Sequence, residues 1–243
     1  MADYSRRRFI KSCSATALWL TVSANGMPKS TEPLSPFARV LLVDEDGRPV
    51  DCKALPAGQE YVFFYPYAST PCFLLNLGQP VSNPVSLTTQ DGQSYQWQGG
   101  VGPQHSVVAF SAICSHKLTH PSATVSFIGF REEAVGYLSD NGEITRRAGI
   151  IQCCSEQSIY DPAQGAKVLS GPAPQPLAAI ALSDEENRLY ATGVYGGTLF
   201  EQFFERFGFR LALEFGEEHV RERVVDSAVV TPIESYTQRR IQC

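Results

Sequence analysis

The 243-residue chain contains 43% hydrophobic and 19% charged residues, which is ordinary for a globular protein. Its formal net charge of −5 gives no reason to expect a nucleic-acid partner, because proteins that bind nucleic acid carry concentrated positive charge. The length allows one large β domain or two small ones. Sixteen prolines and 19 glycines predict many short strands and turns. Seven cysteines predict a mixture of metal ligands, bystander thiols and at most one disulfide.

The first residues have the features of an export signal. Residues 5–11, Ser-Arg-Arg-Arg-Phe-Ile-Lys, resemble the twin-arginine signal S-R-R-x-F-I/L-K, and a mildly apolar run follows over residues 12–24. This run is shorter than the ~20 residues that span a bilayer, yet without cleavage it would remain as a marginal anchor. We therefore expect residues 1–24 to be a twin-arginine signal or membrane anchor. The protein, anchored or soluble, would lie on the periplasmic side of the bacterial inner membrane; a basic disordered arm is the alternative.

A linker rich in proline and serine over residues 25–36 precedes a β-rich region over residues 37–197. Turn signals such as Asp46-Gly47 separate its short apolar runs, and Leu177–Leu182 with Arg188–Thr192 predicts a hairpin. The other runs predicted as strands are Ala38–Val43, Glu60–Tyr65, Cys72–Leu77, Val107–Ile113, Ala123–Phe130, Ala134–Leu138 and Gly149–Cys153.

Residues 198–243 are predicted to be a helix and a tail. Thr198 is expected to cap the helix, in which Phe203 and Phe207 share one apolar face. The tail over residues 220–243 mixes arginines with short apolar pairs. It either closes the β domain or extends onto a partner subunit, and the partner is favoured. The predicted fold class is therefore all-β, with a C-terminal helix and tail.

Three segments carry candidate metal chemistry. In the first, Cys114-Ser115-His116, a thiol and an imidazole two residues apart follow a predicted strand. The second, over residues 153–161, reads Cys-Cys-Ser-Glu-Gln-Ser-Ile-Tyr-Asp, and the third, over residues 171–177, reads Gly-Pro-Ala-Pro-Gln-Pro-Leu. Thiolate and imidazole are the ligands that transition metals and iron–sulfur clusters prefer.

In this order the three segments resemble the Rieske family, whose pattern is C-x-H, then C-x-x-H-x-S-x-Y/F-D, then a G-P-A-P loop. The resemblance covers roughly residues 59–197 and is greatest to subunits of quinol-oxidising complexes that have a long insert between the cluster loops. It implies an antiparallel β-sandwich with a small cluster-binding subdomain at about residues 107–161, and one 2Fe-2S cluster. Carried over to this chain, Cys114 and Cys153 would hold one iron, and His116 would hold the other.

Further positions match the same pattern. Ser158 and Tyr160 occupy places whose hydroxyls donate hydrogen bonds to the cluster sulfurs. Such donors raise the potential, because they stabilise the added negative charge of the reduced state. Gly171 and Pro172 begin the loop that would cover the cluster, and the fixed φ of proline makes that cover stiff.

Two features depart from the family. Glu156 stands where the second ligand histidine is expected, and Thr119 and Ser155 replace the two cysteines of the loop–loop disulfide. Three outcomes are open. Glu156 ligates iron through oxygen, which would lower the potential because a carboxylate favours Fe(III). Alternatively, His120 replaces the missing ligand, or the cluster is lost and the fold persists as a structural subunit.

The remaining cysteines have less specific roles. Cys153 is preferred to Cys154 as the ligand because its spacing to the two hydroxyl donors fits the family, which leaves Cys154 as a small filler. Cys52 and Cys72 either pair in an oxidising compartment or stay as buried thiols. Cys243 is either an inert end or a tether to a partner.

The resemblance implies an electron-transfer subunit of a quinol-oxidising or other periplasmic oxidoreductase complex. It would pass electrons between quinol or an oxidoreductase partner and a c-type cytochrome, beside a cytochrome b-type subunit, with His116 meeting the quinol. The alternative is an interaction subunit that keeps the Rieske fold without the cluster. A Rieske oxygenase is not expected, because its mononuclear iron needs two histidines and His219 is the only one that follows the cluster segments.

Overall fold

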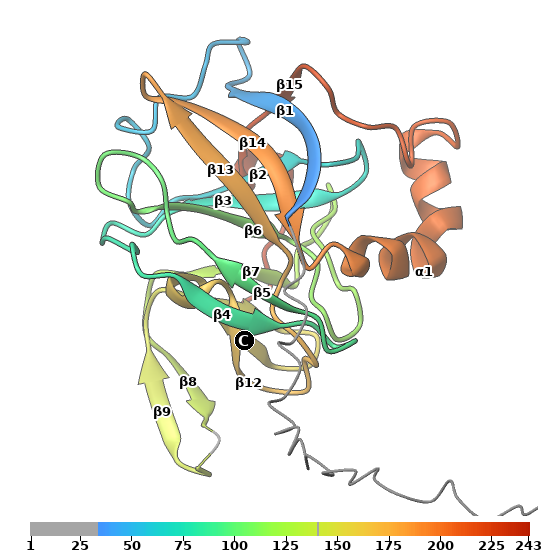
Figure 1. The fold of residues 1–243 in the computed structure, drawn as a ribbon. Coiled ribbons are helices and arrows are strands. Elements are labelled where there is room, and N and C mark those ends of the chain that lie inside the picture. The colour runs from blue at the N-terminus through green and yellow to red at the C-terminus, as the bar shows by residue number, and fades with distance from the viewer. Residues whose placement is uncertain (1–33, 140) are drawn as a thin grey trace, which may run out of the picture.

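The computed structural model describes residues 34–139 and 141–243. Its larger part is an eight-stranded sheet with the strand order β15-β1-β14-β13-β6-β3-β2-β16 (Figure 1). The β1–β15 pairing is parallel, and the other pairings in this sheet are antiparallel. Its strands are β1 (Ser35–Val43), β2 (Glu60–Phe64), β3 (Pro71–Asn76), β6 (Val107–Ser111), β13 (Ala179–Glu185), β14 (Arg188–Tyr195), β15 (Ser227–Val229) and β16 (Thr231–Pro232).

A second, four-stranded antiparallel sheet carries part of the candidate site. Its order is β12-β11-β10-β7, and two separate hairpins, β4–β5 and β8–β9, complete this half of the molecule. Figure 1 shows the β8–β9 hairpin projecting away from the body. These strands are β4 (Val85–Thr88), β5 (Ser94–Trp97), β7 (Ile128–Arg131), β8 (Val135–Leu138), β9 (Ile144–Arg147), β10 (Ile150–Cys153), β11 (Ser158–Asp161) and β12 (Lys167–Ser170).

The large sheet is buried on both faces, so its strands separate two apolar cores. Val62 and Phe63 are neighbours on β2 and contribute to different cores, because successive side chains of a strand point to opposite faces. Val62 belongs to the core that contains Trp97 and Tyr160. Phe63 belongs to the core that contains Phe203 of the C-terminal helix. Continuous apolar runs in these strands are therefore a consequence of two-sided burial.

Helix α1 (Thr198–Phe215) packs at the edge of the core that contains Phe63 and Phe203 (Figure 1). Phe203 is buried and Phe207 packs partly against the core, as the helical periodicity predicts. The predicted cap at Thr198 is wrong, because Gly197 occupies the cap position and Thr198 is already helical. Gly196, with φ of 70°, turns the chain from β14 into the helix, a conformation that glycine adopts without strain.

The tail closes the β domain, and the sequence preference for a partner-bound tail is wrong. Strand β15 pairs with β1, and β16 pairs with β2, so the tail adds a strand at each edge of the large sheet. The short helix α2 (Ile233–Tyr236) follows β16 and buries Ile233. The charges that suggested a partner instead face solvent or pair within the chain, as Arg221 does with Glu201.

The predicted all-β class with a C-terminal helix and tail is confirmed by these elements. Residues 1–24, predicted to be a signal or anchor, and most of the predicted linker lie outside the described residues. Among the described residues, no helix has both the length and the apolar character needed to cross a bilayer.

Candidate metal centre

Two loops meet where the small sheet packs against the large one. Cys114 follows β6, and Cys153 ends β10. Both side chains are buried, and their thiols are hydrogen-bonded to each other. The hydrogen bond from the Cys153 thiol is the main reason that the pKa of Cys114 is lowered to about 6, and the same contact raises the pKa of Cys153. The pair therefore presents one readily ionised sulfur beside a second thiol, which suits a thiolate-ligated metal.

Tight turns place the first loop. The Cys114 N–H donates to the Thr119 carbonyl at 2.8 Å, and the Leu118 N–H donates to the Cys114 carbonyl at 2.9 Å. Leu118 has φ of 59°, an uncommon conformation for a residue with a branched side chain. The reversal leaves His116 at the tip, where its side chain is partly exposed.

Strand β11 places two hydroxyls toward the thiol pair. Ser158 and Tyr160 are two residues apart, so their side chains share one face of the strand. The Tyr160 hydroxyl lies 3.2 Å from Cys114 Sγ, and the Ser115 N–H donates to it at 3.2 Å. Burial raises the pKa of the Tyr160 phenol, which therefore stays protonated and able to donate. Ser158 Oγ is buried without a hydrogen-bond partner among the described residues.

His116 and Glu156 form a second pair of possible metal ligands at the partly exposed side of the loops. His116 Nδ1 is buried, has no hydrogen-bond partner in the part of the chain that the structure describes, and lies 3.8 Å from Glu156 Oε2. Glu156 Oε1 is ion-paired with Lys117. The imidazole nitrogen and one carboxylate oxygen therefore lie near each other, while Lys117 contacts the other oxygen.

The proline-rich segment lies close against the second loop. Gly171 has φ of 89°, and a Cβ atom there would lie 2.5 Å from the Gln157 carbonyl, so only glycine allows this approach. The Ser115 hydroxyl donates to the Gln175 carbonyl at 2.6 Å, and the Gln175 side chain accepts from the Gln90 N–H at 2.7 Å. Gln175 thus ties the cover to the first loop, a role that the sequence pattern did not indicate.

A groove of about 690 Å³ lies beside this arrangement. Its lining includes His116 and Lys117 of the first loop, Pro172 of the cover and Arg206 of α1. The side of the candidate centre that carries the imidazole is therefore accessible from solvent, whereas the thiols are enclosed.

His120, the alternative to Glu156, is directed elsewhere. Its ring packs edge-on against Phe203 and Phe207 of α1, with centroids 4.8 and 5.1 Å apart. Its Nδ1 lies 2.9 Å from the Leu118 carbonyl, and burial lowers its pKa. The His120 ring therefore packs against α1, and its Nδ1 already contacts a main-chain carbonyl.

The possible metal ligands of this site come in two pairs. Within residues 34–139 and 141–243, no group of three or more His, Cys, Asp or Glu side chains could hold a metal ion. A 2Fe-2S cluster takes two ligands at each iron, so its ligands come in two pairs. Cys114 with Cys153 and His116 with Glu156 are two such pairs. His116 Nδ1 and Ser158 Oγ, which are buried and have no hydrogen-bond partner within the described ranges, fit such a group because each could bind it.

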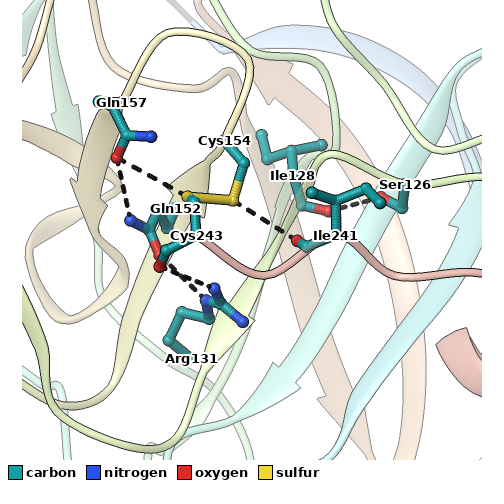
Figure 2. The surroundings of a disulfide bond; sticks show 8 residues. All are labelled: Ser126, Ile128, Arg131, Gln152, Cys154, Gln157, Ile241 and Cys243. Atoms are coloured by element: carbon teal, nitrogen blue, oxygen red, sulfur yellow. Dashed lines mark hydrogen bonds between the residues drawn. A yellow bond between two sulfur atoms is a disulfide. The ribbon is translucent and has the colours of Figure 1, made fainter.

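A disulfide joins Cys154 to Cys243, with 5.6 Å between their Cα atoms (Figure 2). The prediction of Cys154 as a small filler is therefore wrong, and Cys243 is tethered within its own chain rather than being an inert end or a link to a partner. Cys52 and Cys72 are free and buried, so the alternative in which they pair is not realised. Chain spacing gave no signal for the observed pair, because it depends on the path by which the tail returns.

No model of a known protein family matches the chain. Among solved structures, the chain is similar to the soluble domain of the Rieske protein II (soxF) from Sulfolobus acidocaldarius, with 27% sequence identity and a TM-score of 0.44. This similarity covers 65% of the chain and 78% of that domain.

Proposed function

We propose that this protein is an electron-transfer iron–sulfur protein with one Rieske-type 2Fe-2S cluster between its two loops. The observation that carries the proposal is the contact between the buried thiols of Cys114 and Cys153, which come from separate loops. The first of these loops also carries His116, whose Nδ1 has no hydrogen-bond partner among the described residues. The sequence pattern of the three segments supports the same assignment.

Each residue of the site has a role that follows from its position. Cys114 and Cys153 would hold one iron as thiolates, and His116 and Glu156 would hold the other. Bound there, the cluster would supply one-electron transfer. Tyr160 would donate its hydroxyl hydrogen toward the Cys114 sulfur, which favours added negative charge.

Glu156 and Lys117 affect the charge of the site in opposite directions. A carboxylate ligand adds negative charge and favours Fe(III), which lowers the potential relative to a neutral imidazole. The ammonium group of Lys117 contacts the same carboxylate and offsets part of that charge. We therefore expect a potential below that of a site with two histidines, with Lys117 limiting the decrease.

The groove beside His116 supports an exchange partner that approaches from solvent. We infer that the protein passes electrons between quinol or an oxidoreductase partner and a c-type cytochrome, on the periplasmic side of the bacterial membrane. A cytochrome b-type subunit is the partner that the resemblance implies. Export by the twin-arginine route, with the segment over residues 1–24 either removed or kept as an anchor, fits cargo that folds around a cofactor before it crosses the membrane.

The second candidate is an interaction subunit without iron. It is favoured by the ion pair between Lys117 and Glu156, which satisfies one carboxylate oxygen without any metal. His116 Nδ1 and Ser158 Oγ favour the iron–sulfur protein, because neither atom has a hydrogen-bond partner among the described residues and a cluster would give each atom a group to bind.

Iron and acid-labile sulfide analysis, with EPR spectra of the reduced protein, tests the proposal. We expect about two irons and two sulfides per chain in the purified protein, and their loss in Cys114→Ser. Cys52→Ser, which removes a free thiol outside the site, is the matched control and should keep both. If Glu156→Gln leaves the iron content and the spectrum unchanged, Glu156 is not a ligand. A folded wild-type protein without iron after anaerobic purification and cluster reconstitution would contradict the proposal and favour the interaction subunit.

A further inference from the structure

The final segment, residues 237–243, runs alongside the stretch that leads into β7. The Gln238 N–H donates to the Ala123 carbonyl at 3.0 Å. Farther along, the Ser126 N–H donates to the Arg239 carbonyl at 2.9 Å, and the Ile241 N–H donates to the Ser126 carbonyl at 2.8 Å. The segment therefore lies along the small-sheet half of the molecule through main-chain hydrogen bonds.

Arg240 attaches the middle of this segment to the large sheet. Its guanidinium group is ion-paired with Glu60, a carboxylate of β2 that is only 3% exposed, and with Glu234 at 2.8 Å. The same side chain lies 3.4 Å from the Phe130 carbonyl of β7. One residue of the segment thus contacts strands from both sheets.

The last residue of the segment is bonded to the second loop of the candidate centre. Cys154 follows Cys153 directly, and its disulfide to Cys243 is the covalent end of the segment (Figure 2). The Cys154 N–H also donates to the Phe127 carbonyl at 2.7 Å, and Arg131 donates to the Cys243 carbonyl at 3.5 Å. The position of the loop backbone next to Cys153 is therefore coupled to the position of the tail.

The oxidation state of the described cysteines follows their burial. Cys52, Cys72, Cys114 and Cys153 are buried and free. Cys154 is only partly buried and Cys243 is exposed, and these two are bonded. A soluble dithiol can reach this disulfide without unfolding a core, since thiol–disulfide exchange depends on access to the sulfur atoms.

We propose that residues 237–243 are a disulfide-locked strap that positions the second loop, and with it Cys153 of the candidate metal centre. The strap deepens the proposed function, although its effect on the loop does not depend on iron. A dithiol such as dithiothreitol would open it by exchange. The S–S bond takes up two electrons and two protons to give the Cys154 and Cys243 thiols, and the dithiol becomes a disulfide. Without the covalent end, hydrogen bonds and the Arg240 ion pairs alone hold the segment.

Hydrogen exchange and thermal unfolding of the full chain test the strap. In Cys243→Ser we expect amide exchange over residues 123–128 and 154–157 to become roughly tenfold faster or more, because the covalent cross-link no longer restricts local opening. The melting temperature should fall by about 5–15 °C. Gln242→Ser changes the exposed neighbour in the same segment, keeps the disulfide and should match the wild type.

A double-mutant comparison separates the bond from the individual side chains. If the two cysteines act through one bond, Cys154→Ser should give the same change as Cys243→Ser, and the double variant should add nothing further. Dithiothreitol should reproduce the exchange pattern in the wild type and leave Cys243→Ser unaltered. Unchanged exchange in Cys243→Ser, or an effect of Cys154→Ser alone, would overturn the proposal.

These readouts distinguish failure of the strap from failure of the proposed function. Exchange and melting are measured whether or not the protein holds iron, so an iron-free wild type leaves the test of the strap intact. If both proposals are correct, Cys243→Ser should also lose iron and sulfide faster than Gln242→Ser during dialysis against a chelator. Faster exchange with equal iron loss would support the strap as a holder of the loop and overturn its part in positioning Cys153.

Discussion

Glu60 shows how one buried carboxylate can make the stability of this fold depend on pH. It begins β2, is 3% exposed, and has Oε1 without a hydrogen-bond partner among the described residues. Burial raises its pKa from the ordinary 4.5 to about 7, against the opposing effect of Arg240. Glu234 adds a further negative charge nearby, and Arg131 a positive one. The desolvation of the carboxylate thus exceeds the attraction of its ion pair.

The sign of the pH dependence follows from this pKa. Between pH 4.5 and 7 the folded state binds more protons at Glu60 than the unfolded state does, so the free energy of unfolding decreases as the pH rises. The decrease amounts to about 3 kcal/mol once the pH exceeds the folded pKa. We expect Glu60→Gln to remove this decrease, as measured by urea unfolding at pH 5 and pH 8. Glu234→Gln, at the exposed partner of Arg240, should retain it. A pH-independent difference between Glu60→Gln and the wild type would contradict the assignment.

At the level of single residues, part of the candidate site could be inferred from the sequence. The resemblance of the three segments to the Rieske family implied that separate loops converge, and the structure brings the thiols of Cys114 and Cys153 into contact. The partner of Cys154 could not be inferred, because the position of Cys243 depends on main-chain hydrogen bonds and on the Arg240 ion pairs of the intervening tail. Local residue types carry information about a motif, whereas the return path of a distant segment depends on the whole fold.

At the scale of elements, helix α1 supports the first loop through its aromatic face. Phe203 is fully buried and packs against His120, which follows the candidate ligand His116 by four residues. The opposite face of the helix is solvent-exposed, and Phe209 is 82% exposed there. The helix therefore provides a matched pair of phenylalanines, one that packs in the core and one that does not.

Truncation of these two residues should have very different effects. Phe203→Ala should reduce the free energy of unfolding by about 3–5 kcal/mol, because it removes a buried ring and leaves a cavity beside His120. Phe209→Ala should change it by about 0.5 kcal/mol or less. Urea unfolding monitored by circular dichroism measures both. Equal effects would show that the aromatic face does not hold α1 against the sheet.

Elements were predictable where one kind of periodicity dominated. The apolar runs of β2, β3 and β6 and the helical spacing of α1 were recognised because burial repeats along them. Strands β4 and β5 were missed, since exposed polar residues such as Ser86 and Gln96 alternate with few apolar ones. Strand β15 was missed because its three residues lie in a charged tail and gain their pairing only from β1.

At the scale of the whole molecule, the two cores share their central strands. On β3, Phe73 belongs to the core on the candidate-centre side and Leu74 to the core under α1. On β6, Val108 and Ala109 divide in the same way. A strand cannot lose its order on one face alone, so the loss of either core removes the support of the other. We therefore expect the candidate centre and the helical half to unfold in one transition.

Trp97 provides a local probe of this coupling. It is 3% exposed, belongs to the core on the candidate-centre side, and packs against Phe110 of β6 with ring centroids 5.8 Å apart. The chain has two tryptophans, so in Trp19→Phe the fluorescence comes from Trp97 alone. In that background the urea midpoints from fluorescence and far-ultraviolet circular dichroism should coincide.

The coupling between the two cores is tested by destabilising the core that contains Phe203. Phe203→Ala lies under α1 and does not belong to the core of Trp97, yet it should lower both midpoints by the same amount, because the strands between the cores are common to both. Phe209→Ala in the same background should leave both midpoints in place. If Phe203→Ala lowered the circular dichroism midpoint while the Trp97 midpoint stayed fixed, the two halves would unfold independently. In that case the second loop and its strap would be stable without the helical half, and the shared strands would not be the element that couples them.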